Sequence, residues 1–553
     1  MKKADSSIFV AWSSLLLDNK YQRVELKTLK DYVDESTKNG ESIQREVVYH
    51  DPGVIAPAGT EVSAVLPKPK IQKKPRRVKS FHIVTGAQNR TPVMYNLWRN
   101  INAYLVARSA FAEESSLTVM GVTYEKTLFV GGNVLKPSDE NDHYAMSQDW
   151  SSVIEDHVTR EDKVLCGVRI RASANITPTL KKPLTGITAS KDHRIEIYCS
   201  PSRQLQQVPR HHSEPPRMRW TSGFITAPNY IRKKQGLMAE QFHCYGFMII
   251  EEDFDGNVFV RDVNADEESG SFYDLDTFVI DGKVMPAGGG TRVLAAGDAH
   301  FEHVDPRYSA ALWGIHGNPK NDKPAIDALN ISHQIVQDCM DFTARNHHVI
   351  KQSTHWYRMY IKNLTVESEF NKVTNYIDEI YRDNVETIIV EGNHDVHVKS
   401  WLHDYKVVNS DAVNSKIWYM LNYEWRLHMD NQGAEGAEFS PFKFWLEQHA
   451  ENPFTYIQER DSMIINGIQF GMHSHNGVGG KPGSTQQFAH YYIPVFKGHD
   501  HKLEIFRNCR SNGFICKIPS YVKGLVEWCP GFTLCHPDGN AQSIELIDTQ
   551  WRA

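Results

Sequence analysis

The sequence lacks long apolar runs and paired cysteines. None of its apolar runs reaches the ~18 residues that a membrane-spanning helix requires. The eight cysteines form no CxxC pair and no disulfide-like framework, which favours a reducing compartment. Polar residues interrupt the short apolar patch near the start, and no small-residue cleavage site follows, so we expect no signal peptide. These absences predict a cytoplasmic protein that does not use the membrane as a partner.

Charge of one sign is also scarce. The formal net charge is −6, so any nucleic-acid binding must come from local basic patches and not from a global field. The chain has 553 residues, which exceeds a single hydrophobic core and predicts two to four domains. Histidine, in contrast, is frequent, with 26 residues. Many of them follow position 298, where they could serve as metal ligands.

Changes in composition divide the chain into four predicted parts. We expect a small charged N-terminal unit over 1–65, a basic proline-rich linker over 66–80, an α/β domain over 81–285 and a catalytic domain over 286–553. Within the first part, residues 24–38 have a helical pattern. The seven basic residues of 66–80 fit a solvated linker, and they also fit a strip that contacts DNA phosphates.

Apolar periodicity predicts an α/β fold. Residues 81–88 and 117–124 have the pattern of buried strands, and the amphipathic segment 94–111 between them has the pattern of a helix. Asp255-Gly256 lies between two apolar runs and predicts a hairpin. Segment 229–246 mixes aromatic and basic residues. This mixture suits stacking on a DNA strand, or else a domain surface beside a core strand.

Four apolar runs in the C-terminal half stop at or near a glycine and are followed by Asp, Asn or His. The segment "IIVEGNHD" shows the pattern most clearly. Ligands of α/β sheets bind at the carboxyl ends of strands, so these ends can converge on one site. In chain order the ends carry Asp298 and His300; Asn393, His394 and Asp395; His473 and His475; and His499 and His501.

In this order the segments resemble the signature of the calcineurin-like metallophosphoesterase superfamily: D-x-H, GD, GNHD or GNHE, a lone His, and GHxH. The resemblance covers about 290–535. It implies a C-terminal sandwich of two sheets flanked by helices, here preceded by an α/β domain and the small N-terminal unit. The second motif departs from the pattern, because no GD occurs between 301 and 390. Asp338 is the best candidate, with Gln337 in place of the usual glycine and Asp341 as the alternative.

The resemblance implies two divalent metal ions. Mixed imidazole, carboxylate and amide ligands suit manganese, iron or zinc better than calcium or magnesium. His475 is an alternative to His473. His394 would protonate the leaving oxygen, and Asp395 would orient its ring. The implied ligands are Asp298, His300, Asp338 and His501 for one ion, and Asp338, Asn393, His473 and His499 for the other.

The metal motifs do not choose a substrate, because the superfamily includes phosphatases, phosphodiesterases, nucleotidases and DNA nucleases. The segments "NYIRKKQGLMAEQFHCYGFMIIE", "DFTARNHH" and "HSHNGVGGKPGS" are similar to a narrower family of large phage-encoded metallophosphoesterases, the pre-early DNA-degradation proteins of T-five-type tailed phages. This similarity extends over about 80–550. It implies a manganese-dependent DNase that degrades host DNA in the bacterial cytoplasm, and a homo-oligomer is compatible with it.

Two other functions fit the same motifs. One is a phosphatase or phosphodiesterase for small nucleotides or phosphoproteins. The other is a non-catalytic DNA-binding regulator in which the metal is structural. The glycine-rich loop 476–484, which lacks the GxxxxGK[ST] spacing of a P-loop, fits a phosphate-binding loop or a plain flexible one.

Overall fold

The computed structural model divides the chain into two compact units. Unit 1 comprises Met1–Gln206, Arg217–Gly288 and Ala553, and unit 2 comprises Gln207–Pro216 and Gly289–Arg552. No helix in the described part of the chain is long and apolar enough to cross a membrane. Beyond Val24, the helix predicted over 24–38 lies outside the described residues. The structure describes residues 21–24, 53–63, 66–73, 75–124, 129–130, 133–134, 150–231, 233–346, 350–405, 411–432, 438–519 and 522–553.

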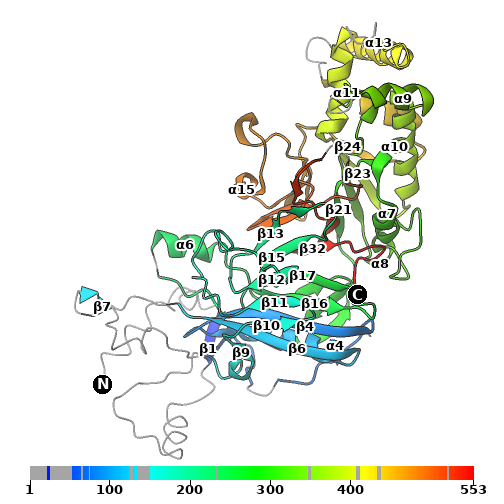
Figure 1. The fold of residues 1–553 in the computed structure, drawn as a ribbon. Coiled ribbons are helices and arrows are strands. Elements are labelled where there is room, and N and C mark those ends of the chain that lie inside the picture. Colours follow the sequence, from blue (N-terminus) through cyan, green and yellow to red (C-terminus); the bar gives the residue numbers. More distant parts are fainter. Residues whose placement is uncertain are drawn as a thin grey trace, which may run out of the picture. The chain divides into compact units, whose positions relative to one another are not determined.

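Unit 1 is built on a five-stranded sheet with the order β17-β16-β4-β6-β9 (Figure 1). Strands β4 and β6 are parallel, and helix α4 connects them, so the strand–helix–strand unit predicted here is confirmed. Strands β16 and β17 form the predicted hairpin, with Gly256 in the left-handed region at its turn. The elements are β4 (Val78–Gln88), α4 (Tyr95–Ser109), β6 (Ala112–Val122), β9 (Val158–Thr159), β16 (Gly246–Glu252) and β17 (Val258–Asn264).

Smaller sheets surround this one in unit 1. Strands β1 (Tyr21–Val24), β2 (Val54–Pro57) and β5 (Val93–Met94) form a three-stranded sheet. Strands β10, β11, β12 and β15 lie next to one another in this order, and β18, β19, β20 and β3 form a further sheet. Their bounds are β3 (Lys70–Ile71), β10 (Lys163–Leu165), β11 (Val168–Arg171), β12 (Ile195–Tyr198), β15 (Arg217–Thr221), β18 (Phe272–Asp274), β19 (Thr277–Ile280) and β20 (Lys283–Pro286).

The two segments of unit 1 that suggested DNA contact take part in its fold. Residues 66–80 contribute β3 and the start of β4, and Lys73, Arg77 and Lys79 form ion pairs with carboxylates at 2.6, 3.3 and 2.7 Å. These three cations are therefore partly neutralised within the protein.

The aromatic residues of 229–246 are not available for stacking on bases. Tyr230, His243 and Tyr245 are buried, and the Tyr230 hydroxyl lies 2.6 Å from Nδ1 of His243. These three rings fill the interior beside β16, so of the two interpretations the segment fits the domain surface beside a core strand. The exposed residues of this segment lie in and next to the short helix α6 (Lys234–Glu240).

Unit 2 contains a six-stranded sheet with the order β24-β23-β22-β21-β31-β32. Strands β21, β22, β23 and β24 are parallel to one another. Strand β31 pairs antiparallel with β21, and β32 pairs antiparallel with β31. The carboxyl ends of the parallel strands therefore meet at one edge, since these strands point the same way. The bounds are β21 (Val293–Asp298), β22 (His333–Gln337), β23 (Glu386–Val390), β24 (Thr455–Ile457), β31 (Gly531–Cys535) and β32 (Ala541–Glu545).

A second group of strands in unit 2 has the order β28-β29-β27-β26-β25. Strands β26 and β27 are parallel, and so are β27 and β29. A short pair, β14 (Arg210–His211) with β30 (Leu525–Val526), completes the unit. The bounds are β25 (Ile464–Ile465), β26 (Ile468–Met472), β27 (Val495–Lys497), β28 (Leu503–Phe506) and β29 (Cys509–Asn512).

The two groups of strands in unit 2 pack face to face through a shared apolar core. Ile335 and Ile388 from the first sheet belong to the same buried cluster as Ile468, Phe470 and Phe496 from the second. This is the two-sheet arrangement flanked by helices that was predicted, and the α/β class is confirmed.

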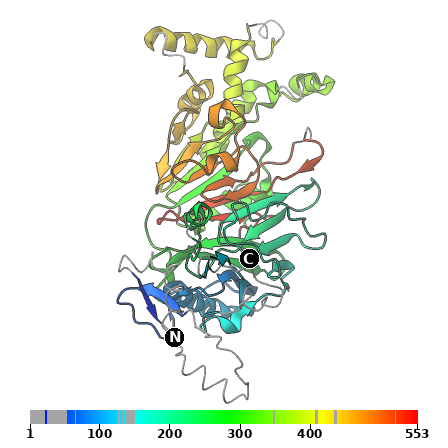
Figure 2. The same ribbon diagram turned by 90° about the vertical axis from the view of Figure 1, so that its left-hand side faces the viewer.

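Helices cover the other face of the first sheet. Gln334 alternates with Ile335 along β22 and points away from the shared core, where it accepts a hydrogen bond from Trp313 and donates to the carbonyl of Ile380. Helix α10 begins at a capping box formed by Thr365 and Ser368. In both views α13 lies at the end of unit 2 away from β31 and β32 (Figures 1 and 2). The bounds are α7 (Pro306–Trp313), α8 (Ala325–Ala328), α9 (Ser353–Ile361), α10 (Val366–Ile380), α11 (Asn393–His403), α13 (Ser415–Gln432), α14 (Pro441–His449) and α15 (Thr485–Phe488).

Candidate metal centre

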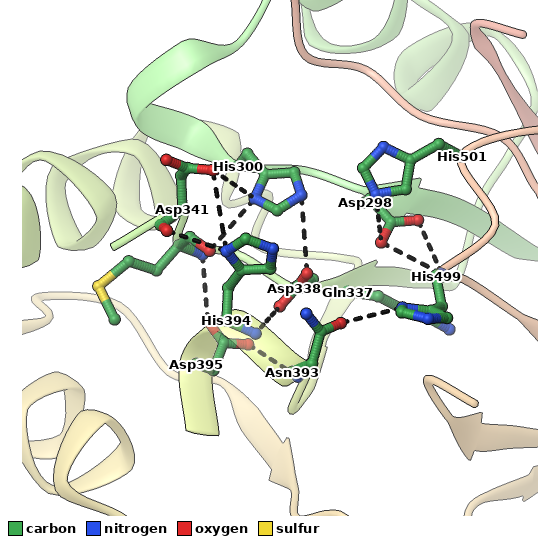
Figure 3. Close-up of polar contacts among 12 residues, drawn as sticks. Asp298, His300, Gln337, Asp338, Asp341, Asn393, His394, Asp395, His499 and His501 are labelled. Carbon is green, nitrogen blue, oxygen red and sulfur yellow. Dashed lines mark hydrogen bonds and ion pairs between the residues drawn. The ribbon is translucent and has the colours of Figure 1, made fainter. Parts of the chain in front are cut away.

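The predicted site residues follow the carboxyl ends of parallel strands in both sheets of unit 2. Asp298 is the last residue of β21, Asp338 follows β22, and Asn393 begins α11 after β23. His473 follows β26, and His499 follows β27 after a glycine. Because these strands run in parallel within each sheet, their side chains converge at one edge (Figure 3).

Two glycines allow the strand ends to approach one another closely. A Cβ atom on Gly392 would lie 2.1 Å from Oδ1 of Asp338, and one on Gly498 would lie 2.4 Å from Oε1 of Gln337 and 2.9 Å from Nδ1 of His473. No side chain fits at such distances. The glycines that end these strands are therefore required by the packing of the site and not only by turn chemistry.

Four predicted ligands adopt left-handed backbone conformations. The φ angles of His300, Asp338, His499 and His501 are 38°, 48°, 70° and 53°. Such angles are uncommon for residues other than glycine, and they occur most often where the surrounding structure imposes them at functional sites. Their concentration at these strand ends marks the cluster as a site.

The carboxylate of Asp298 is fully buried among imidazoles. Its Oδ1 lies 3.3 Å from Nε2 of His501 and 3.5 Å from Nε2 of His473. The backbone N–H of His499 donates to both carboxylate oxygens, at 3.1 and 2.9 Å. The backbone therefore holds this carboxylate in place while its neighbours contribute ring nitrogens.

Asp338 lies between the imidazoles of His300 and His473. Its Oδ1 accepts a hydrogen bond from the backbone N–H of His394 at 2.9 Å. Its Oδ2 is buried without a hydrogen-bond partner, and it lies 3.6 Å from Nε2 of His300 and 3.7 Å from Nε2 of His473. Buried polar oxygens are rarely left unpaired, so this atom has the properties of a ligand.

Asn393 and Gln337 complete the arrangement around His473. The Oδ1 atom of Asn393 lies 3.0 Å from both His473 Nε2 and His499 Nδ1. On the other side of the His473 ring, Nδ1 lies 3.4 Å from Oε1 of Gln337. With Nδ1 donating to this amide oxygen, Nε2 presents its lone pair to Asn393, Asp298 and Asp338. A hydrogen bond of this kind orients a metal-binding imidazole.

Burial sets the protonation of the ring nitrogens. Burial and the neighbouring His394 lower the pKa of His300 to about 3, and burial lowers the pKa of His473 well below its usual value. Burial also lowers the pKa of His499. These three rings are therefore neutral at pH 7, which is the form that binds metal ions.

The surroundings shift the pKa values of the Asp298 and Asp338 carboxylates in opposite directions. Burial opposes ionisation of Asp298, but the nearby His501 and His473 outweigh it and hold the pKa of Asp298 well below its usual range. Burial and the negative charge of Asp298 raise the pKa of Asp338 well above its usual value. A carboxylate oxygen of Asp298 and one of Asp338 lie within 4.8 Å of each other. Two carboxylates this close cannot both be ionised without a compensating positive charge.

The donor set fits a divalent cation. Three groups in the described part of the chain could hold a metal ion, since their ligand atoms lie within 4.8 Å of one another. The donor atoms in these groups are carboxylate oxygens, imidazole nitrogens and one sulfur, and Asn393 adds an amide oxygen beside them. The groups are His300, Asp338 and His394; Asp298, Asp338 and His473; and His300, His501 and Cys516.

The structure separates the alternatives that the sequence left open. His475 lies 3.2 Å from the carboxylate of Glu459, whereas His473 faces Asp298 and Asp338. The Asp341 carboxylate lies on the Nδ1 side of the His300 ring, at 3.9 Å, and also faces His303 and His394 at 3.5 and 3.8 Å. Asp338 is the one that faces Nε2 of both His300 and His473. His473 and Asp338, rather than His475 and Asp341, therefore belong to one candidate metal-binding group with Asp298.

The expected role of Asp395 needs correction. Its carboxylate accepts hydrogen bonds from the backbone N–H groups of Gly392 at 2.9 Å and Met340 at 3.1 Å. The oxygen that lies against Nδ1 of His394, at 2.9 Å, is the backbone carbonyl of Asp341. Asp395 thus stabilises the start of α11 and the loop after β22, and the Asp341 carbonyl orients the His394 ring (Figure 3).

Two residues of the site were missed by the sequence reasoning. Gln337 was noted only as a departure from the motif, although its side chain meets His473. Cys516 had no signal, because a single cysteine after a short strand has no motif spacing. Burial, together with the charges of Asp298, Asp341 and Asp338, raises the pKa of the Cys516 thiol well above its usual value.

Fold and cluster together define an α/β protein with a candidate metal centre at the edge of two packed sheets. No protein-family model matches the chain, and no solved structure matches it. The chain is similar to Protein A1 of Escherichia phage T5, with 28% identity over 475 residues, which is 84% of this chain and 81% of that protein. The similarity therefore spans both units.

Replacing Gly392 by alanine tests the geometry around Asp338. The added Cβ would lie 2.1 Å from Oδ1 of Asp338, so the carboxylate must move. We expect metal affinity to fall at least ~10-fold, as it does when the partners of metal ligands are lost. Isothermal titration calorimetry with manganese measures this. In the control Gly288→Ala, the new Cβ meets no atom within 4 Å, and unchanged affinity is expected. Equal affinities of both variants would contradict the geometry.

The low pKa of His300 predicts a pH-dependent stability of the metal-free protein. The ring has a pKa of about 3 when folded and about 6.5 when unfolded, so only the unfolded state takes up this proton between these values. Stability is full above pH 6.5 and falls as the pH decreases. Between pH 7 and 5 the loss is about 2 kcal/mol.

Urea unfolding in the presence of a chelator at pH 7 and pH 5 measures this loss. His300→Gln should reduce the difference between the two pH values by about the same amount, about 2 kcal/mol. His490→Gln, at an exposed position, is the control and should retain the difference of the unsubstituted protein. The same difference in all three proteins would show that His300 is not buried in its neutral form.

Proposed function

We propose that this protein is a two-metal-dependent phosphodiesterase that hydrolyses DNA, acting in the cytoplasm of a phage-infected bacterium. The observation that carries the proposal is the convergence of seven side chains, among them Asp298 and Asp338 with its unpaired Oδ2. They come from the motifs that resemble the metallophosphoesterase signature, in the same order. The similarity to a phage protein supports the phage setting.

The proposed roles follow the positions of the donor atoms. Asp298, His300 and His501 would hold one ion, and Asn393, His473 and His499 the other, with Asp338 shared between them. Such a pair of ions supplies an activated water and stabilises the charge that develops on the phosphoryl oxygens. Softer imidazole ligands with carboxylates are compatible with manganese, which the sequence resemblance favours.

His394 is the proposed proton donor to the leaving oxygen. With Nδ1 donating to the Asp341 carbonyl at 2.9 Å, Nε2 is the nitrogen that can exchange a proton with the substrate. One His394 nitrogen lies within 4.8 Å of the donor atoms of His300 and Asp338. The ring therefore stands beside the position at which a phosphoryl group would be held, and its orientation is set by the backbone.

The segment between His473 and His499 supports a nucleic-acid substrate. It begins and ends at proposed ligands and presents Lys481 and Tyr492 to solvent, with Tyr492 78% exposed. The ring of Tyr492 lies 4.5 Å from that of Tyr491. An exposed aromatic ring is suited to base stacking, and an exposed lysine in the same segment is suited to phosphate contact. This segment is a further candidate for DNA contact, in addition to the exposed basic residues of 66–80.

Degradation of linear and closed-circular DNA with manganese tests the proposed activity. We expect cleavage by the unsubstituted protein. Asp338→Asn removes the shared carboxylate and should abolish cleavage together with binding of the second metal equivalent. His394→Ala should lower kcat by about 10²–10⁴-fold while metal content is retained, because only proton transfer is lost.

The two DNA forms and a small substrate separate the alternatives. Loss of both DNA forms means an endonuclease, and loss of linear DNA alone means an exonuclease. Hydrolysis of a chromogenic phosphodiester without DNA cleavage would favour a phosphodiesterase for small nucleotides. Binding of DNA without turnover in any divalent metal would favour the regulator.

Tyr492→Ala tests the DNA contact separately from the chemistry. Loss of one stacked base costs about 1–3 kcal/mol, so KM for single-stranded DNA should rise about 5- to 150-fold. Hydrolysis of the chromogenic phosphodiester should be unchanged. Tyr419→Ala, on α13 and also exposed, is the matched control. If both variants cleave DNA like the unsubstituted protein, Tyr492 is not part of the DNA-binding surface.

A further inference from the structure

Cys516 lies in a segment that runs alongside the first two proposed ligands. Phe514 pairs with Asp298, and Cys516 pairs with Val304 on the far side of His300. The N–H of Ile515 donates to the carbonyl of Asp298 at 3.2 Å. These backbone contacts fix the segment against the strand end that carries Asp298 and His300, so the position of the thiol is determined by the fold of unit 2.

The sulfur of Cys516 belongs to a compact group of donor atoms. It lies within 4.8 Å of a ring nitrogen of His300 and one of His501, which are themselves within that distance of each other. The residue is 1% exposed. Of the groups in the described part of the chain that could hold a metal ion, this is the one that contains sulfur.

A second observation, at the same His300 ring, supports a bound ion. His300 uses Nδ1 for a hydrogen bond with the Met340 carbonyl at 3.2 Å, so its Nε2 is left to face Oδ2 of Asp338 at 3.6 Å. That oxygen is fully buried and has no hydrogen-bond partner. The His501 ring lies beside Asp298, and its Nε2 is 3.3 Å from Oδ1 of Asp298. The two imidazoles grouped with Cys516 thus also lie next to the carboxylates of Asp338 and Asp298.

We propose that the Cys516 thiolate is a ligand of the ion held by Asp298, His300 and His501. On binding, the S–H bond breaks, the proton passes to solvent, and a sulfur–metal bond forms without any change of oxidation state. The inference rests on the metal centre of the proposed function. It gives the two metal-ion positions of that centre different donor atoms. The position with sulfur selects zinc, because thiolate favours zinc over manganese. The other position, with oxygen and nitrogen donors alone, accepts manganese.

Zinc X-ray absorption of the full-length protein tests this inference without any substitution. Sulfur at about 2.3 Å is resolved from nitrogen and oxygen ligands at about 2.0–2.2 Å. We expect a sulfur contribution in the protein loaded with zinc. A zinc shell of nitrogen and oxygen alone would overturn the inference, and so would a protein that binds no metal.

Cobalt substitution identifies the residue. With two equivalents of cobalt we expect a thiolate-to-cobalt charge-transfer absorption in the near ultraviolet. Cys516→Ser should lose it while the visible cobalt bands persist, and zinc affinity should fall at least ~10-fold with a smaller change for manganese. Cys509→Ser, another buried cysteine, in β29, is the matched control and should keep the absorption. An absorption that survives in Cys516→Ser would overturn the assignment.

These readouts do not depend on nuclease activity. If sulfur is in the zinc shell but no DNA or phosphodiester is hydrolysed, the proposed function fails and the ligand assignment stands. If DNA is cleaved while no sulfur contacts the metal, the assignment fails and the proposed function stands.

Discussion

Two buried carboxylates, Asp298 and Asp338, are the constraint on which the rest of unit 2 depends. Burying one ionised carboxylate is costly, and burying two beside the same imidazoles costs more. Backbone N–H groups of His499 and His394 compensate part of this cost, and ring nitrogens compensate another part. The Oδ2 atom of Asp338 remains without a donor. The site therefore contains more acceptor atoms than hydrogen-bond donors. A bound divalent cation would compensate this excess.

The sheets make this arrangement possible. The site side chains converge because parallel strands in both sheets end at the same edge. The strand ends also approach each other so closely that a residue with a side chain would not fit at two positions. Gly392 and Gly498 provide that approach. The left-handed conformations of His300, Asp338 and His499 turn the chain sharply after each strand. Such conformations cost about 1–3 kcal/mol each, and the packed core of Ile335, Ile388 and Phe470 is what maintains them.

Unit 1 shows how local sequence signals for a partner can be absorbed by the fold. The basic residues Lys73, Arg77 and Lys79 pair with carboxylates of unit 1, but the side chains of Arg77 and Lys79 stay 72% and 47% exposed, so this charge run is only partly neutralised. Tyr230 and His243 meet each other in its interior. A charge run or an aromatic cluster is a signal for nucleic acid only when it remains exposed. The exposed Tyr492 meets that condition, and it lies between two strands that carry proposed ligands.

The sequence alone determined the α/β class, the strands of unit 2, and the candidate residues at their ends. These features are local, because an apolar run that stops at glycine before Asp, Asn or His can be recognised without knowing its neighbours. Tertiary structure decided the rest. It placed His473 rather than His475, and Asp338 rather than Asp341, in one group with Asp298. It gave the carbonyl of Asp341 the role expected for Asp395, and it brought Cys516 to His300 and His501. Such pairings depend on distances between segments far apart in the chain, which no spacing in the sequence encodes.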